Sequence, residues 1–188
     1  MSEQSTLLSA ENSLLLLIDI QTKLTQVMPE SAAEDMQENS HRLIESANLL
    51  DIPVVVTEQY PKGLGATLET LKATLNNKAI CFEKTSFSCC AANDFQVALQ
   101  KSARTQIIIA GQETHVCILQ TALQLLTLGY QVHILEDAVC SRKAEHKFYA
   151  LQRMQQQGAI ISNFESVLFE WLQDSKHPHF SRISQLLR

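Results

Sequence analysis

Short, uninterrupted runs of apolar residues alternate along this chain with longer stretches in which apolar residues recur at helical spacing. The clearest run is Leu14 to Ile18, and Asp19 follows it directly. Continuous apolar runs of this length are typical of strands that are buried on both faces, as in parallel sheets covered by helices. Strands that alternate with helices are joined by crossover connections. The pattern therefore predicts an α/β fold with a parallel sheet between two layers of helices.

Five further apolar segments predict the remaining strands, at 54–57, 79–84, 106–110, 131–136 and 159–162. Helical spacing or end signals predict helices at 31–50, 93–101, 118–128, 143–157 and 164–172, with one more in the tail 177–188. Gly129 and Gly158 follow two of these helices, where glycine commonly ends a helix. The segment 60–65 contains one proline and two glycines, so we expect a loop there.

Length and composition favour one compact domain. The chain has 188 residues, of which 45% are hydrophobic, and it shows no internal repeat or linker. We therefore expect a single domain over residues 1–188, with residues 1–12 as a flexible N-terminal tail. The net charge of −5 argues against partners such as nucleic acid or an anionic membrane surface.

The lack of a recognisable secretory signal and the pattern of cysteines lead us to expect a cytoplasmic protein. The polar N-terminus lacks the basic and apolar regions of a secretory signal, and the longest apolar run is too short to span a bilayer. Five cysteines are scattered and odd in number, which fits free thiols in a reducing compartment better than a disulfide framework.

Polar residues follow several of the predicted strands. Asp19 ends the first, Glu58-Gln59-Tyr60 follows the second, and Lys84 ends the third, while Cys117 follows the fourth and Asp137 the fifth. Ligands of parallel α/β sheets bind outside the carboxyl ends of the strands. All of these residues could therefore face one crevice.

Taken singly, three of these residues have ordinary explanations. A cysteine is often a small buried hydrophobe, an acid after a strand can cap a helix or form a structural pair, and a lysine at a strand end is usually solvated. Together they form a chemical set. Asp19 can accept the proton of the Cys117 thiol, and Lys84 can supply positive charge while holding Asp19 in place. The set follows the logic of a catalytic triad without a histidine base.

Three motifs, at the ends of the first, third and fourth predicted strands, resemble those of the isochorismatase-like cysteine hydrolase superfamily. They are Leu-Ile-Asp19-Ile-Gln21, Lys84-Thr85-Ser86-Phe87 and Gly111-x-x-Thr114-x-x-Cys117. The segment 137–142 and the short strand at 160–162 also match the family pattern, and the resemblance extends from about Ser13 onward. The tail His177-Pro178-His179-Phe180-x-x-Ile183 is similar to that of the isochorismatase domain-containing proteins.

The resemblance implies a three-layer α/β/α fold around a six-stranded parallel sheet. It implies that Asp19 is the general base, Lys84 its charged partner and Cys117 the nucleophile. It also implies a cis peptide bond between Gln112 and Glu113 that turns a backbone N–H inward. The backbone N–H groups of Glu113 and Cys117 would then form an oxyanion hole.

The chain departs from the nicotinamidases of this superfamily, which resemble one another in an Asp-x-His metal-binding pair after the second strand. Here Glu58 could replace the Asp, but Tyr60 stands where the His would be and no second His follows in 62–67. A single carboxylate is a poor zinc site. We therefore expect no metal and no cofactor, and we do not expect nicotinamidase activity.

The retained cysteine favours acyl chemistry over the vinyl-ether cleavage of isochorismatases, which needs no such nucleophile. Gln59, Tyr60 and Phe87 are predicted to line the substrate pocket, although ordinary packing would equally account for the two aromatic residues. His115 lies two residues before Cys117, and near neighbours at a helix start point apart, so we expect no catalytic role for it.

The sequence thus predicts a metal-independent hydrolase of a small amide or related acyl substrate, acting through a Cys117 thioester and forming a homo-oligomer. The alternative is a catalytically silent family member that serves as a binding or scaffold protein. A thiol redox protein is a third reading, but no resolving cysteine is evident near Cys117, and Cys89-Cys90 is better explained by buried packing.

Overall fold

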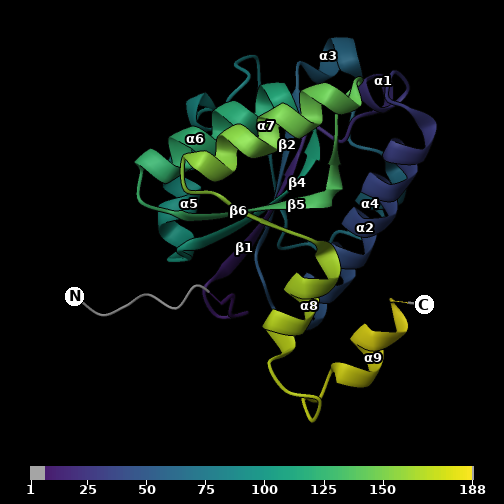
Figure 1. The fold of residues 1–188 in the computed structure, drawn as a ribbon, viewed down its shortest axis with the longest axis vertical. Helices are drawn as coiled ribbons and strands as arrows, with labels where there is room; N and C mark the ends of the chain where they lie inside the picture. Colours follow the sequence, from purple (N-terminus) through teal and green to yellow (C-terminus); the bar gives the residue numbers. More distant parts are fainter. Residues whose placement is uncertain (1–6, 188) are drawn as a thin grey trace.

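The computed structural model describes residues 7–187. Its centre is a sheet in the strand order β3-β2-β1-β4-β5-β6, and every neighbouring pair of strands is parallel (Figure 1). The strands are β1 (Ser13–Ile18), β2 (Val54–Gln59), β3 (Ile80–Lys84), β4 (Gln106–Gln112), β5 (Gln131–Cys140) and β6 (Ile160–Ser162). The six-stranded parallel sheet predicted from the apolar runs is confirmed.

Helices cover both faces of the sheet, which confirms the three-layer α/β/α architecture (Figure 1). One face packs against α2 (Glu30–Leu49), α4 (Glu69–Lys72), α8 (Phe164–Leu172) and α9 (Phe180–Gln185). The other face packs against α5 (Phe95–Ser102), α6 (Leu119–Thr127) and α7 (Ala144–Gln156). Among residues 7–187, no helix is both long and apolar enough to cross a membrane.

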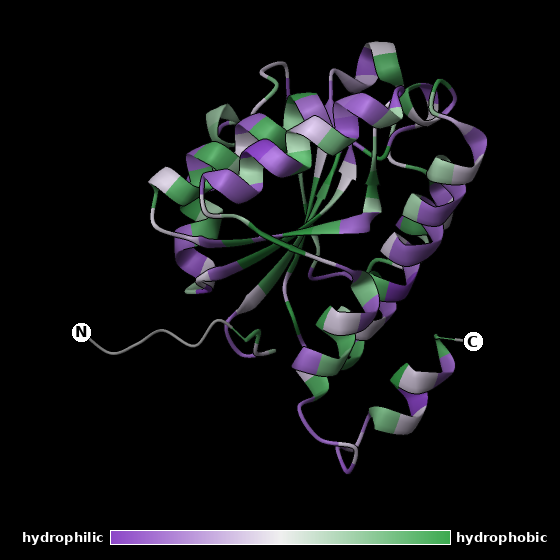
Figure 2. Cartoon of the chain, in the orientation of Figure 1, coloured by the Kyte–Doolittle hydropathy of each residue, from purple (hydrophilic) through white to green (hydrophobic). Residues whose placement is uncertain are grey.

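The first strand shows why its sequence is apolar without interruption. Leu15 and Leu17 contribute to the core on the α2 side, whereas Leu14, Leu16 and Ile18 contribute to the core on the α5 side. Because successive side chains of a strand point to opposite faces, a strand between two helical layers needs apolar residues at every position. Figure 2 shows the resulting hydrophobic centre, with hydrophilic residues concentrated on the outer surfaces of the helices.

Several predicted boundaries are corrected by the structure. The segment 60–65 is not all loop, because Pro61 begins the short helix α3 (Pro61–Leu64), where its fixed φ suits a first helical position. Strand β5 continues to Cys140 past an irregularity between Ile109 and Gly111 in its pairing with β4. Within 177–187 the tail forms a helix only over α9, residue 188 lies outside the described part of the chain, and the short helix α1 (Thr22–Thr25) was not predicted.

The prediction of a flexible tail over residues 1–12 is wrong for residues 7–12, and residues 1–6 lie outside the described part of the chain. Leu8 is buried, and its N–H donates to Glu170 Oε2 on α8 at 2.7 Å. Gln106 at the start of β4 binds both the Ser9 N–H and the Leu7 carbonyl. This segment therefore packs across the amino-terminal edge of the sheet.

A close approach of β1 and β4 sets the geometry of the opposite edge. Gly111 on β4 has φ of +126°, and a Cβ built on it would lie 2.1 Å from the Ile18 carbonyl oxygen. Only glycine fits at that position, so the two strands meet there without an intervening side chain. Strand order reverses between β1 and β4, which is where open α/β sheets form ligand crevices.

Candidate active site

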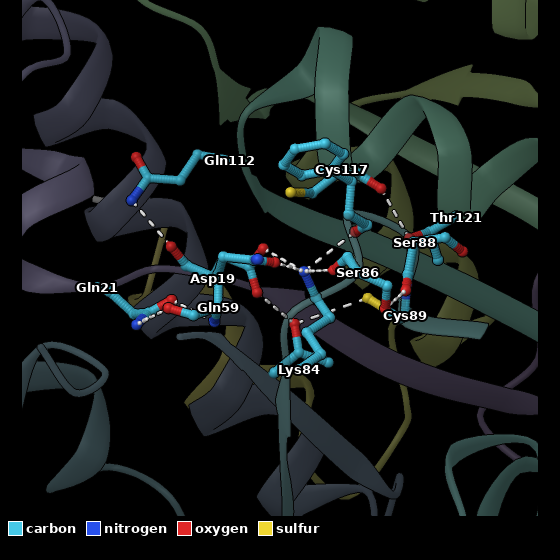
Figure 3. A network of polar contacts seen from close by, with 12 residues as sticks. Asp19, Gln21, Gln59, Lys84, Ser86, Ser88, Cys89, Gln112, Cys117 and Thr121 are labelled. Atoms are coloured by element: carbon cyan, nitrogen blue, oxygen red, sulfur yellow. Dashed lines mark hydrogen bonds and ion pairs between the residues drawn. The ribbon is translucent and has the colours of Figure 1, made fainter. Parts of the chain in front are cut away.

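Asp19 and Lys84 form a buried ion pair at the carboxyl edge of the sheet. Asp19 directly follows β1 with φ of +54°, and Lys84 is the last residue of β3. Lys84 Nζ lies 2.7 Å from Asp19 Oδ2, and both side chains are completely shielded from solvent. Figure 3 shows the two side chains meeting at the centre of the polar network, with Cys117 beside them. The structure therefore brings together the three residues of the predicted triad.

Lys84 is held by a set of oxygen acceptors that goes beyond Asp19. Its Nζ donates to Gln59 Oε1 at 2.7 Å, to the Phe87 carbonyl at 3.0 Å and to the Ser86 carbonyl at 3.3 Å. Gln59 is itself fixed, because its Nε2 donates to the Thr85 carbonyl at 2.7 Å. A buried ion pair is tolerable only when further hydrogen bonds satisfy both charges, and this lysine meets that condition.

Cys117 lies in a π-helical turn, η2 (Thr114–Ile118), which connects β4 to α6. Cys117 is 6% exposed, and its side chain lies beside the Asp19 carboxyl group, whose charge acts on the thiol. Burial is the main cause that raises the pKa of Cys117, and the Asp19 charge adds to it while Lys84 opposes it. The pKa of Asp19 is also raised by burial, against the opposing effects of Lys84 and Thr57. The arrangement is that of a thiol beside a base rather than a preformed thiolate.

The turn before Cys117 contains a cis peptide bond between Gln112 and Glu113. Gln112 ties this turn to the first strand, because its Nε2 donates to the Asp19 carbonyl at 3.0 Å and to Thr25 Oγ1 at 2.8 Å. The Glu113 carboxylate accepts from Arg142 Nε at 3.0 Å and from the Arg142 N–H at 3.1 Å. An oxyanion hole formed by the N–H groups of Glu113 and Cys117 stays a prediction.

The predicted pocket residues occupy different positions. Tyr60 and Phe87 are both more than half exposed, and Tyr60 lines a groove of about 460 Å³ that reaches Lys84. The side chain of Gln59 is instead committed to Lys84 and to the Thr85 carbonyl. Gln59 therefore supports the lysine in this structure, and direct contact of any of these three residues with a substrate stays a prediction.

Glu58, which stands where nicotinamidases have a metal-binding Asp, forms hydrogen bonds within the protein. Glu58 Oε1 accepts hydrogen bonds from the Thr67 N–H and hydroxyl, both at 2.7 Å. Within residues 7–187, no three or more His, Cys, Asp or Glu side chains gather in a way that could hold a metal ion. Glu58 thus anchors the loop after β2, while metal independence stays a prediction.

Asp137 does not face the crevice, contrary to the expectation from its place after the fifth strand. Because β5 continues beyond it, Asp137 reaches the start of α8, where its Oδ1 accepts the Phe164 N–H at 3.0 Å. A carboxylate favours the amino-terminal end of a helix. His115 Nδ1 lies 3.0 Å from Ser141 Oγ, and the His115 ring packs against that of His146.

Four residues of the network were not assigned to the site from the sequence. All four are buried, and each forms a hydrogen bond within the polar network around Asp19, Lys84 and Cys117. They are Gln21, Thr57, Cys89 and Thr121. Thr57 pairs with Ile18 next to Asp19, so it is placed at the site by the register of β1 with β2, which the sequence alone does not record. The long-range contacts of Cys89 with Thr57 and Thr121 had no signal in the sequence either.

Comparisons with known proteins agree with this fold. The isochorismatase domain model matches residues 13–166. The chain is 41% identical over 183 residues to isochorismatase family protein 1A of Dictyostelium discoideum, covering 95% of this chain and 87% of that protein. It is 38% identical over 180 residues to isochorismatase domain-containing protein 2 of Danio rerio, covering 96% and 89% respectively.

Solved structures match over nearly the whole chain. A Caenorhabditis elegans protein described as MAR1 ribonuclease superposes with a TM-score of 0.90 at 38% identity, covering 96% of this chain and 91% of that one. The YcaC gene product of Escherichia coli, described as an octameric hydrolase of unknown specificity, gives 0.91 at 23% identity, covering 99% and 91%. The family model and the two relatives show that this chain belongs to the isochorismatase family.

Proposed function

We propose that the chain hydrolyses a small amide or related acyl compound through a thioester at Cys117. The observation that carries this proposal is the placement of a buried thiol beside a carboxyl group that is itself paired with a buried lysine. A purely structural core would gain little from burying these three polar groups together, because each is costly to remove from water. The arrangement is explained if the carboxyl group moves a proton.

The proposed reaction begins when a carbonyl carbon reaches the Cys117 sulfur. Asp19 takes the thiol proton as the sulfur attacks, since the raised pKa of Cys117 keeps the proton on sulfur at rest. The N–H groups of Glu113 and Cys117 stabilise the oxyanion. Asp19 then gives its proton to the leaving amine, and water, activated by Asp19, hydrolyses the thioester. Lys84 stays paired with Asp19 and favours its ionised form.

The reactivity of Cys117 toward iodoacetamide tests this proposal without a known substrate. With Asp19 as base, the alkylation rate should rise as Asp19 ionises and then form a plateau before the thiol itself ionises. Asp19→Asn and Lys84→Ala should abolish or blunt this plateau. Cys117→Ala measures the background from the exposed Cys81. A wild-type rate that simply tracks ionisation of the thiol, with no plateau, would instead support the silent binding or scaffold protein.

A screen of amides and esters then addresses the substrate. Intact-protein mass should show an acyl group on the wild type that is absent from Cys117→Ala. RNA belongs in the same screen, because the C. elegans neighbour is described as a ribonuclease. The net charge of −5 and the complete burial of the Asp19 and Lys84 side chains favour a small molecule. RNA cleavage that survives Cys117→Ala would overturn the proposed assignment.

We also infer that the chain forms a homo-oligomer and acts in the cytoplasm. The YcaC neighbour is described as octameric, and α7 of this chain exposes Phe148 and Tyr149, which are 55% and 66% accessible. Large exposed aromatic residues that lie together favour association. Light scattering should give a mass of at least twice the 21.1 kDa of one chain. A monomer at micromolar concentration would contradict the first inference, and a tagged chain found in an organelle would contradict the second.

A further inference from the structure

Asp19 receives a hydrogen bond that the proposed reaction does not yet use. Its Oδ2 is taken by Lys84, whereas its Oδ1 accepts the hydroxyl of Thr57 at 2.8 Å. Thr57 lies on β2 and is fully buried. The Asp19 N–H also donates to the Thr57 carbonyl at 3.1 Å. Thr57 therefore forms hydrogen bonds with both the backbone and the side chain of the proposed base.

A second thiol supports the direction in which the Thr57 hydroxyl points its proton. Cys89 Sγ lies 3.6 Å from Thr57 Oγ1 and donates to it. Burial raises the pKa of Cys89 to about 12, so this thiol keeps its proton at neutral pH and stays a donor. A hydroxyl has a single proton, so a Thr57 oxygen that accepts from Cys89 is left to donate to Asp19.

The same cysteine is anchored to the nucleophile's turn. The Cys89 N–H donates to Thr121 Oγ1 at 3.0 Å, and the Thr121 hydroxyl donates to the Cys117 carbonyl at 2.7 Å (Figure 3). Two threonine hydroxyls thus connect Cys89 to both ends of the proposed proton transfer, at Asp19 and at Cys117. A buried hydroxyl that only needed satisfying would require neither a fixed donor nor a fixed direction.

We propose that Thr57, oriented by Cys89, is a positioning residue that holds the Asp19 carboxyl group in its proton-accepting form and aims it at Cys117. The inference rests on the proposed function, because it assigns Thr57 a role only if Asp19 acts as the base. The ionisable groups that meet Asp19 are Lys84 from β3, Cys117 from η2 and Cys89 from the short 3₁₀ helix η1 (Cys89–Ala91). Of the hydrogen bonds to its carboxyl group, the one from Thr57 can be removed without deleting a charge or a thiol.

Thr57→Val tests the inference, because valine keeps the shape of threonine and removes the hydroxyl. The acid limb of the alkylation profile is the pH range over which the rate rises as Asp19 ionises. The Thr57 hydrogen bond lowers the pKa of Asp19, so its loss should move this limb upward by about one pH unit. The rate at a pH below that limb should fall on the order of tenfold. Thr57→Ser keeps the hydroxyl and should leave the limb at its wild-type position. Cys89→Ala should move it less than Thr57→Val does, because Thr57 can still donate to Asp19.

The outcomes separate this inference from the proposed function. If the wild type shows a plateau that Asp19→Asn removes, while Thr57→Val leaves the limb unmoved and lowers only the thermal stability, then Thr57 is merely structural and the inference fails. If the wild type shows no plateau dependent on Asp19, the proposed function itself fails. Should Thr57→Val not fold, Thr57→Ala and Thr57→Ser differ by the hydroxyl alone. Coincident limbs in that pair would overturn the inference, and a higher limb in Thr57→Ala would support it.

Discussion

Two buried polar sites in the same sheet are built in opposite ways. Around Asp19 and Lys84, the charged atoms have partners at 2.7 to 3.3 Å. His133, near the start of β5 and opposite Ile108 and Ile160, is equally buried, yet neither ring nitrogen has a hydrogen-bond partner among the described residues. The first site keeps its charges by pairing them, and the second avoids charge, because burial lowers the pKa of His133 to about 4.

This difference distinguishes buried positions that can exchange a proton from buried positions that serve only in packing. A paired, hydrogen-bonded charge can exchange a proton while its surroundings compensate the change. A neutral imidazole without partners has nothing to stabilise its protonated form, so it behaves as a core residue until acid forces a proton on it. The two sites should therefore respond differently to mutation and to pH.

The largest effect is expected when one half of the buried ion pair is removed. Lys84→Met leaves Asp19 buried without its cation, and breaking such a pair typically costs about 3–5 kcal/mol of unfolding free energy. Urea denaturation at neutral pH measures that loss. The matched control is the double variant Asp19→Asn with Lys84→Met, which carries neither charge and should recover much of the stability. A loss below about 1 kcal/mol in the single variant would show that the pair is not effectively buried.

A smaller effect is expected at His133, and it depends on pH. The unfolded chain binds a proton at His133 below about pH 6.5, whereas the folded chain resists protonation until about pH 4. The stability contribution is therefore complete above pH 6.5 and is lost as the pH falls toward 4, for a total of about 3 kcal/mol. His133→Leu removes the titrating group, so the stability difference between the wild type and this variant should change by that amount across the window. A constant difference from pH 7 to pH 4 would show that acid does not act through His133.

The sequence predicted the paired site far better than the unpaired one. Asp19 and Lys84 end apolar strands, and parallel strands place their carboxyl ends at one edge, so their proximity follows from topology. Asp137 misled the same reasoning, because the irregular pairing of β5 with β4 lets the strand run on past it. Register and bulges depend on packing between distant segments, which no local pattern records.

His133 and Thr57 are further residues whose hydrogen-bond partners cannot be predicted from the local sequence. Within the strand 131–136, a histidine between Val132 and Ile134 gives no sign of whether its ring will meet a partner. Thr57 is an ordinary β-branched strand residue until β1 is placed beside it in register. The parallel sheet and the proximity of Asp19, Lys84 and Cys117 were thus predictable, whereas the hydrogen bonds around these residues depend on three-dimensional contacts.

The smallest effect is expected at the ion pair between Arg142 and Glu113, at the rim of the same site. Its N–O distance of 3.0 Å is close to the 2.7 Å of the Lys84–Asp19 pair, but the Arg142 side chain is 59% exposed. Water and salt screen an exposed pair, so Arg142→Gln should cost less than about 1 kcal/mol of unfolding free energy. The matched control is Lys78→Gln, which breaks a surface pair with Asp51 of the same 3.0 Å length. Similar small losses in the two variants, both vanishing at high salt, would establish that burial rather than distance distinguishes the Asp19 site. A loss at Arg142 as large as that at Lys84 would instead make the Glu113 turn part of the buried network and erase the distinction.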